Sequence, residues 1–184
     1  MITKPYKTAK LADVTQAFGV NKAPYQPNGH SGVDFWFKDC YGEFLVAPEK
    51  CKITKVITDE TIDNDYYPRF KKGYGLVMKS IADPSVTYLY WHVLQAIPVA
   101  VGDIVESGQV VAQMGNSGYC VSGGIEVPLK YRGTKGAHLH YEKRVDGKLV
   151  DVLPSIDFNS TVKYDTITEV SRFVTKMINL IKKR

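Results

Sequence analysis

Short runs of hydrophobic and β-branched residues, separated by turn residues, recur along the middle of this chain. Their lengths, and the alternation of apolar with polar positions in several of them, are typical of β-strands. The predicted strands are residues 32–37, 44–47, 52–58, 75–81, 86–93, 109–114 and 137–145. Asp146-Gly147, directly after the last of these, is a hairpin signal. No stretch before residue 160 has helical periodicity, so the pattern predicts a mainly β core.

Three regions between or before these strands are expected to be loops. Residues 1–30 are punctuated by glycine and proline, and residues 59–73 are polar. Residues 116–137 are rich in glycine and lack periodicity, and we expect one short strand inside them. The pattern therefore places no strand in the first part of the chain.

The end of the chain has a different pattern. Hydrophobic residues recur there at helical spacing: Ile167, Val170, Phe173, Val174, Met177, Ile178 and Ile181. Thr166 and Glu169 fit a capping box at the start, and the basic residues at 182–184 suit the carboxyl end of a helix. We predict an amphipathic helix over 166–182. Its apolar face either packs against the β core, which we favour, or contacts a membrane surface.

Composition suits one globular domain, since 44% of the 184 residues are hydrophobic and 23% are charged. We place this domain at 1–160, with an N-terminal segment at 1–14, and assign 161–184 to the helical tail. The net charge of +5 indicates attraction to polyanions. Because no basic stripe interleaved with aromatic residues occurs, we expect no nucleic-acid binding. Anionic cell-wall polymers and membrane surfaces remain candidates.

The cysteines and the hydrophobic runs exclude several kinds of site and segment. Cys40, Cys51 and Cys120 form no C-x-x-C pair, which argues against a cysteine-rich zinc site. We favour three buried thiols over a disulfide between Cys40 and Cys51. No segment approaches the ~20 apolar residues of a membrane-spanning helix. The N-terminus has no apolar run of signal-peptide length.

The candidate chemistry lies in the four histidines. His138 and His140 lie two apart on a predicted strand, so both imidazoles point to one face. His30 precedes Asp34 by four residues, and His92 closes an aromatic strand. Each motif alone fits an ordinary structural role, such as a polar strand face, a loop cap or a packed core histidine. Together, His30, Asp34 and one histidine of the H-x-H pair supply the three protein ligands of a catalytic zinc site, with the other two histidines near the open position.

Six motifs occur in order between residues 15 and 158. They are His30-x-x-x-Asp34-Phe35, Gly73-Tyr-Gly75, Tyr90-Trp-His92, Val101-Gly-Asp-x-Val-x-x-Gly-Gln109, Gly115-Asn-Ser-Gly118 and His138-Leu-His140. Their order and rough spacing resemble those of the lysostaphin-type, or LytM-type, zinc endopeptidases. The resemblance implies an antiparallel β-sheet with a substrate groove, of the duplicated-hybrid-motif type. It also implies Zn²⁺-dependent hydrolysis of peptide bonds in the stem or cross-bridge of bacterial peptidoglycan.

The same resemblance implies a role for each site residue. His30, Asp34 and His140 are the expected zinc ligands. His138 is the expected catalytic base, and His92 is expected to help activate water and stabilise the tetrahedral intermediate. The expected partners are peptidoglycan peptides, and we expect a monomer.

The chain departs from the family pattern in two places. The stretch between Gly118 and His138 is longer than usual, so residues 119–135 are expected to form an added loop at the groove wall. No wall-binding domain is recognisable, and the basic helix follows the domain instead.

Two further questions are whether the protein is an active enzyme and where it acts. An alternative to the enzyme is a catalytically inactive LytM-like module that binds peptidoglycan or activates another wall hydrolase. The presence of all five site residues favours the enzyme. We expect it to act at the bacterial cell wall, as a bacteriolytic phage-type endolysin released by holins, as a virion-associated enzyme, or as a secreted enzyme without its leader.

Overall fold

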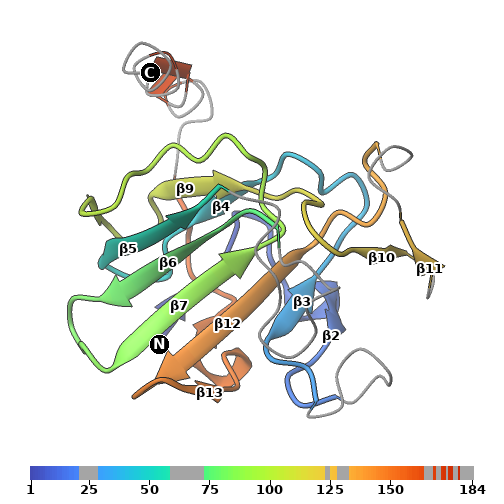
Figure 1. The fold of residues 1–184 in the computed structure, drawn as a ribbon. Coiled ribbons are helices and arrows are strands. Elements are labelled where there is room, and N and C mark those ends of the chain that lie inside the picture. The colour runs from blue at the N-terminus through green and yellow to red at the C-terminus, as the bar shows by residue number, and fades with distance from the viewer. Residues whose placement is uncertain are drawn as a thin grey trace.

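The computed structural model describes residues 1–20, 29–58, 73–122, 125–127 and 133–163, and six residues between 168 and 178. Its centre is an antiparallel sheet of eight strands (Figure 1). They are β2 (Val14–Gln16), β3 (Val33–Phe35), β5 (Cys51–Ile57), β6 (Gly75–Ser80), β7 (Val86–Trp91), β8 (Ile104–Val105), β12 (Leu139–Val145) and β13 (Lys148–Val150). Their order is β2-β3-β12-β7-β6-β5-β8, and β13 pairs with β12. The long strand β12 therefore lies between β3 and β7.

Three pairs of short strands complete the described fold. They are β1 (Ile2–Thr3) with β14 (Ile156–Asp157), β4 (Phe44–Val46) with β9 (Val110–Gln113), and β10 (Val121–Ser122) with β11 (Ile125–Glu126). The β1–β14 pair is parallel and joins the start of the chain to its later part. The described residues up to 163 contain 3₁₀ helices at Leu11–Asp13 and Leu153–Ser155 but no α-helix.

The core fills one side of the central sheet. Tyr90 on β7 and Tyr141 on β12 are register partners, and their rings meet edge to face with centroids 4.8 Å apart. The hydroxyl of Tyr90 donates a hydrogen bond to the Val46 carbonyl on β4 at 2.8 Å. The β4–β9 pair thus packs against this side, and alternation along β12 leaves the residues on either side of Tyr141 facing the other way.

The mainly β prediction is confirmed. Each of the seven predicted strands corresponds to an observed strand whose ends agree within two residues. Asp146 and Gly147 connect β12 to β13, and both have positive φ, 48° and 77°, as a tight hairpin turn requires. The three cysteines are free and buried, as predicted.

Two loop predictions were incomplete. Residues 1–30 contain β1 and β2, which span two and three residues and pair with β14 and β3. Residues 116–137 contain two short strands, β10 and β11, where one was expected. The predicted loop at 59–73 lies almost wholly outside the described residues.

Most of the predicted helix at 166–182 also lies outside the described residues, so it stays a prediction. Two described members of its apolar stripe, Val174 and Ile178, are 50% and 46% exposed. Within the described part of the chain, no helix has the length and apolar character needed to cross a membrane.

Gly75 permits the close approach of β6 and β7. It pairs with Trp91, and a Cβ at this position would lie 2.6 Å from the Trp91 ring and 2.7 Å from the Tyr90 carbonyl oxygen.

We expect Gly75→Ala to lower the free energy of unfolding by about 1–3 kcal/mol, because the added methyl overpacks the site. Urea unfolding followed by circular dichroism measures this. Lys79→Ala, exposed on the same strand, is the control and should change stability by less than about 0.5 kcal/mol; equal effects of the two substitutions would contradict the prediction.

Candidate metal centre

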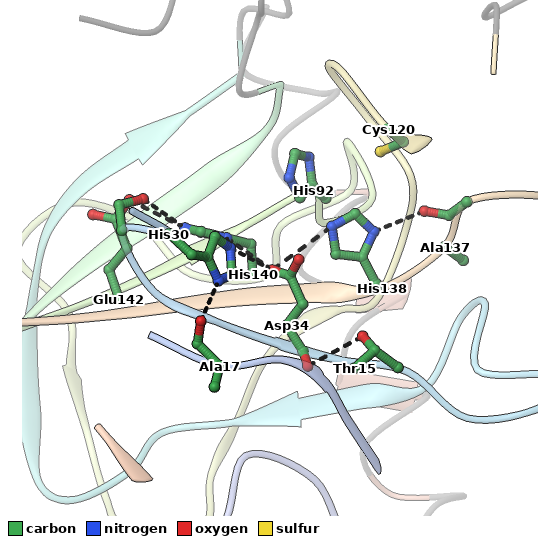
Figure 2. Close-up of polar contacts among 12 residues, drawn as sticks. Thr15, Ala17, His30, Asp34, His92, Cys120, Ala137, His138, His140 and Glu142 are labelled. Carbon is green, nitrogen blue, oxygen red and sulfur yellow. Dashed lines mark hydrogen bonds and ion pairs between the residues drawn. The ribbon is translucent and has the colours of Figure 1, made fainter. Parts of the chain in front are cut away.

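All five predicted site residues come together on the face of the sheet opposite the core (Figure 2). His140 on β12 is the register partner of Asp34 on β3 and also of Trp91 on β7. His138 shares the face of His140 because the strand alternates, and His92 directly follows Trp91. His30 lies in the loop that leads into β3. Pairing of three strands therefore builds the cluster from distant parts of the sequence.

Three ligand atoms of this cluster converge on one point. His140 Nδ1 lies 2.9 Å from His30 Nε2 and 2.9 Å from Asp34 Oδ1. His30 Nε2 lies 3.2 Å from the same carboxylate oxygen. Two imidazole nitrogens and one carboxylate oxygen match the donor types of catalytic zinc sites. Among the described residues, this trio is the one group of at least three His, Cys, Asp or Glu side chains with suitable spacing for a metal ion.

The contacts in this trio also control its charges. Burial alone would raise the pKa of Asp34, but His138, His140 and His30 outweigh it and hold that pKa well below its usual range. Burial alone would lower the pKa of His140, but its hydrogen bonds with Asp34 and Glu142 prevail and raise the pKa to about 9. The carboxylate is therefore ionised at neutral pH and attracts positive charge to the ligand atoms.

Hydrogen bonds on the outer side of each ring decide which nitrogen is free to bind a metal. His30 Nδ1 donates to the Ala17 carbonyl at 3.2 Å, so its Nε2 keeps a lone pair that points into the trio. His140 has the opposite orientation. Its Nε2 lies 3.2 Å from Glu142 Oε1, and its Nδ1 faces Asp34. The two histidines thus offer different nitrogens to the same point.

His92 and His138 form a second pair beside the trio. Their ring centroids are 4.5 Å apart. His92 Nδ1 donates to the Ser117 carbonyl and His138 Nδ1 donates to the Gly136 carbonyl, each at 2.8 Å. Because each Nδ1 carries a hydrogen, the lone pair of either ring in its neutral form is on Nε2, and His138 Nε2 lies 4.0 Å from Asp34 Oδ1. This pair suits proton transfer next to a metal site.

Two glycine-containing motifs of the sequence hold His92 in place. The backbone at His92 has φ of 61°, which is uncommon for a residue other than glycine. Ser117 Oγ donates to the Val93 carbonyl at 2.8 Å and accepts from the Tyr74 backbone N–H at 2.9 Å, while its own carbonyl holds the His92 ring. A Cβ at Gly73 would overlap the Ser117 carbonyl, so only glycine fits there.

The end of the predicted added loop is tied to the same motif. Asn116 Nδ2 donates to the carbonyls of Gly133 and Lys135, each at 2.9 Å. Residues 123–124 and 128–132 lie outside the described residues, so the position of the loop at a groove wall stays a prediction.

Three polar side chains around the cluster were not predicted from the sequence. Ser31 and Glu142 contact His140, and Arg144 contacts Glu142. Glu142 and Arg144 continue the alternation that places His140 on this face of β12, so the i, i+2 spacing after the H-x-H pair could have identified both.

Comparison with known proteins identifies the family. The model of a family described as Peptidase family M23 matches residues 28–152, which include all five predicted site residues. No curated protein matches the chain. The fold is also found in solved structures. LytU has a TM-score of 0.59 and 23% identity, with 83% of this chain and 89% of that chain covered.

Two further structures share the fold. The catalytic domain of the antimicrobial peptidase lysostaphin from Staphylococcus simulans has a TM-score of 0.57 and 21% identity, with 80% of this chain and 92% of that chain covered. A zinc containing peptidase from Vibrio cholerae has a TM-score of 0.54 and 22% identity, with 88% and 40% covered. Since the family model spans more than half of the sequence, this chain, with its LytM/lysostaphin-type fold, belongs to peptidase family M23.

Proposed function

We propose that the protein is a zinc-dependent endopeptidase that hydrolyses peptide bonds in the stem or cross-bridge of bacterial peptidoglycan. The observation that carries this proposal is the convergence of His30 Nε2, Asp34 Oδ1 and His140 Nδ1 beside two further histidines. Membership of a peptidase family supports the reaction class. The similar structures of an antimicrobial peptidase and of a zinc containing peptidase support the choice of metal and of substrate.

In this mechanism His30, Asp34 and His140 hold the metal. Zinc bound there would supply a Lewis acid, able to polarise a peptide carbonyl and to lower the pKa of water to about 7. His138 accepts a proton from the attacking water at Nε2, while its Nδ1–H stays on the Gly136 carbonyl. His92, when protonated at Nε2, donates a hydrogen bond to the developing oxyanion or a proton to the leaving amine.

The ligand assignment predicts that metal and activity are lost together. We expect His30→Ala, Asp34→Ala and His140→Ala to purify without zinc and to release no peptidoglycan fragments, because two ligands do not hold zinc in this geometry. Elemental analysis and mass spectrometry of released fragments measure the two properties. Hydrolysis that continues in the presence of a chelator would contradict the proposal. A wild-type protein that binds peptidoglycan, but does not bind zinc and does not cut peptidoglycan, would indicate the inactive module instead.

The proton-transfer assignment predicts a different result for the second pair. We expect His92→Ala and His138→Ala to retain zinc and to lose turnover by about 10²–10⁴-fold, since each removes a group that moves a proton or stabilises charge. Zinc content and the rate of fragment release are measured on the same samples. If His138→Ala lost the metal while His140→Ala kept it, the roles within the H-x-H pair would be the reverse of those proposed.

We further propose that the protein is a monomeric lysin, of phage type or secreted, and that its basic tail contacts the membrane surface. The exposure of Val174 and Ile178 supports contact with a surface over packing against the β core. No nucleic-acid partner is proposed.

Deletion of residues 166–184 tests the role of the tail. We expect the truncated protein to keep its melting temperature and its activity on purified peptidoglycan, and to lose activity against intact cells, because only the latter requires the apolar stripe. Thermal unfolding, fragment release and turbidity of a cell suspension are the three measurements. A melting temperature that falls together with both activities would show that the helix packs on the domain.

A further inference from the structure

We propose that Glu142, held by Ser31 and Arg144, is the positioning residue that orients His140 for metal binding. This inference rests on the proposed zinc site. His30, His92 and His138 are each held through Nδ1 by a backbone carbonyl. His140 differs because its outer nitrogen is held by side chains.

Glu142 is a buried carboxylate between His140 and Arg144 on one face of β12. Its side chain has 0% exposure, and alternation places it on the same face as His140 and Arg144. Oε1 lies 3.2 Å from His140 Nε2, and Oε2 lies 3.1 Å from Arg144 Nη2. Figure 2 shows Glu142 and Asp34 on opposite sides of the His140 ring. A buried charge is costly unless partners compensate it, so a carboxylate at this position needs both contacts.

The hydroxyl of Ser31 determines where the proton of His140 lies. Ser31 Oγ donates its one hydrogen to Glu142 Oε1 at 3.0 Å, so towards His140 it can only accept. It lies 3.2 Å from His140 Nε2. Both neighbours of Nε2 are therefore acceptors, and Nε2 carries the hydrogen. When the ring is neutral, as a metal ligand must be, its lone pair is then on Nδ1, which points at His30 and Asp34.

The loop that carries the first ligand is fitted to this arrangement. Ser31 follows His30, and a Cβ at the next residue, Gly32, would lie 2.9 Å from His140 Nε2 and 2.5 Å from the Tyr141 carbonyl oxygen. Only glycine lets the loop lie this close to β12. The Ser31–Glu142 hydrogen bond consequently links the loop ligand to the strand ligand.

A purely structural ion pair between Glu142 and Arg144 is the competing explanation, and zinc affinity separates the two. We would measure the zinc dissociation constant of the full chain by competition with a chromogenic chelator, the visible absorption of the Co²⁺-substituted protein, and the melting temperature of the metal-free protein. The variants are Glu142→Gln, which keeps the size of the side chain, and Ser31→Ala and Arg144→Gln, which act only through Glu142 and Nε2. Glu106→Gln is the matched control, since Glu106 is exposed and pairs with Lys50.

We expect Glu142→Gln to weaken zinc binding by about 10–100-fold and to alter the Co²⁺ spectrum, as substitution of carboxylates behind metal-bound histidines does. Ser31→Ala and Arg144→Gln should weaken binding less, and Glu106→Gln should leave it unchanged. If Glu142→Gln does not fold, the other two variants decide. Zinc affinity and Co²⁺ spectra equal to those of the wild type, with only a lower metal-free melting temperature, would overturn the inference. A wild-type protein that binds no zinc would instead overturn the proposed function, and this inference with it.

Discussion

The pairing of β12 between β3 and β7 is the interaction on which both the core and the site depend. On one face of β12, Leu139 and Tyr141 are fully buried in the hydrophobic core. On the other face lie His138, His140 and Glu142. Because side chains alternate along a strand, a register shift of one residue would exchange the two sets. The burial of apolar surface that stabilises the domain, of the order of 2 kcal/mol for each large side chain, therefore also keeps the ligand atoms in position.

Two carboxylates with different surroundings act on the ring of His140. Asp34 lies at Nδ1 of His140, close to Nε2 of His30. Glu142 lies at Nε2 of His140, and its carboxylate accepts hydrogen bonds from Ser31 and Arg144. A carboxylate whose neighbours are histidines, which can give up a proton when a metal binds, suits a metal ligand, whereas one paired with arginine suits a fixed hydrogen-bond acceptor. The arginine beside Glu142, which keeps its charge at all relevant pH values, thus separates the role of Glu142 as hydrogen-bond acceptor from the role of Asp34 as proposed metal ligand.

Sequence reasoning predicted the parts of this structure that have a period or a motif. Seven strands and the grouping of His30, Asp34, His92, His138 and His140 followed from the hydrophobic pattern and from the order of motifs. The strands β1 and β2 gave no such signal, and they form where a partner strand offers hydrogen bonds. The choice of ring nitrogen escaped prediction because it depends on contacts between residues over 100 positions apart in sequence, such as Ser31 with Glu142. Glu142 itself lies two residues beyond His140 on the same strand face, and it was missed because the alternation was followed only as far as the H-x-H pair.

Two of the three proposed ligands differ from the proposed proton-transfer residues in how the fold supports them. Asp34 and His140 lie within paired strands, whereas His92 follows the end of β7 and His138 precedes β12. The ring of His92 depends on the Ser117 carbonyl, and the neighbouring Asn116 holds the end of the loop before His138. A change in that loop would therefore reach the proton-transfer pair more directly than the metal ligands. The loop before His138 can therefore vary while Asp34 and His140 keep their positions, because regular sheet pairing is the more rigid support.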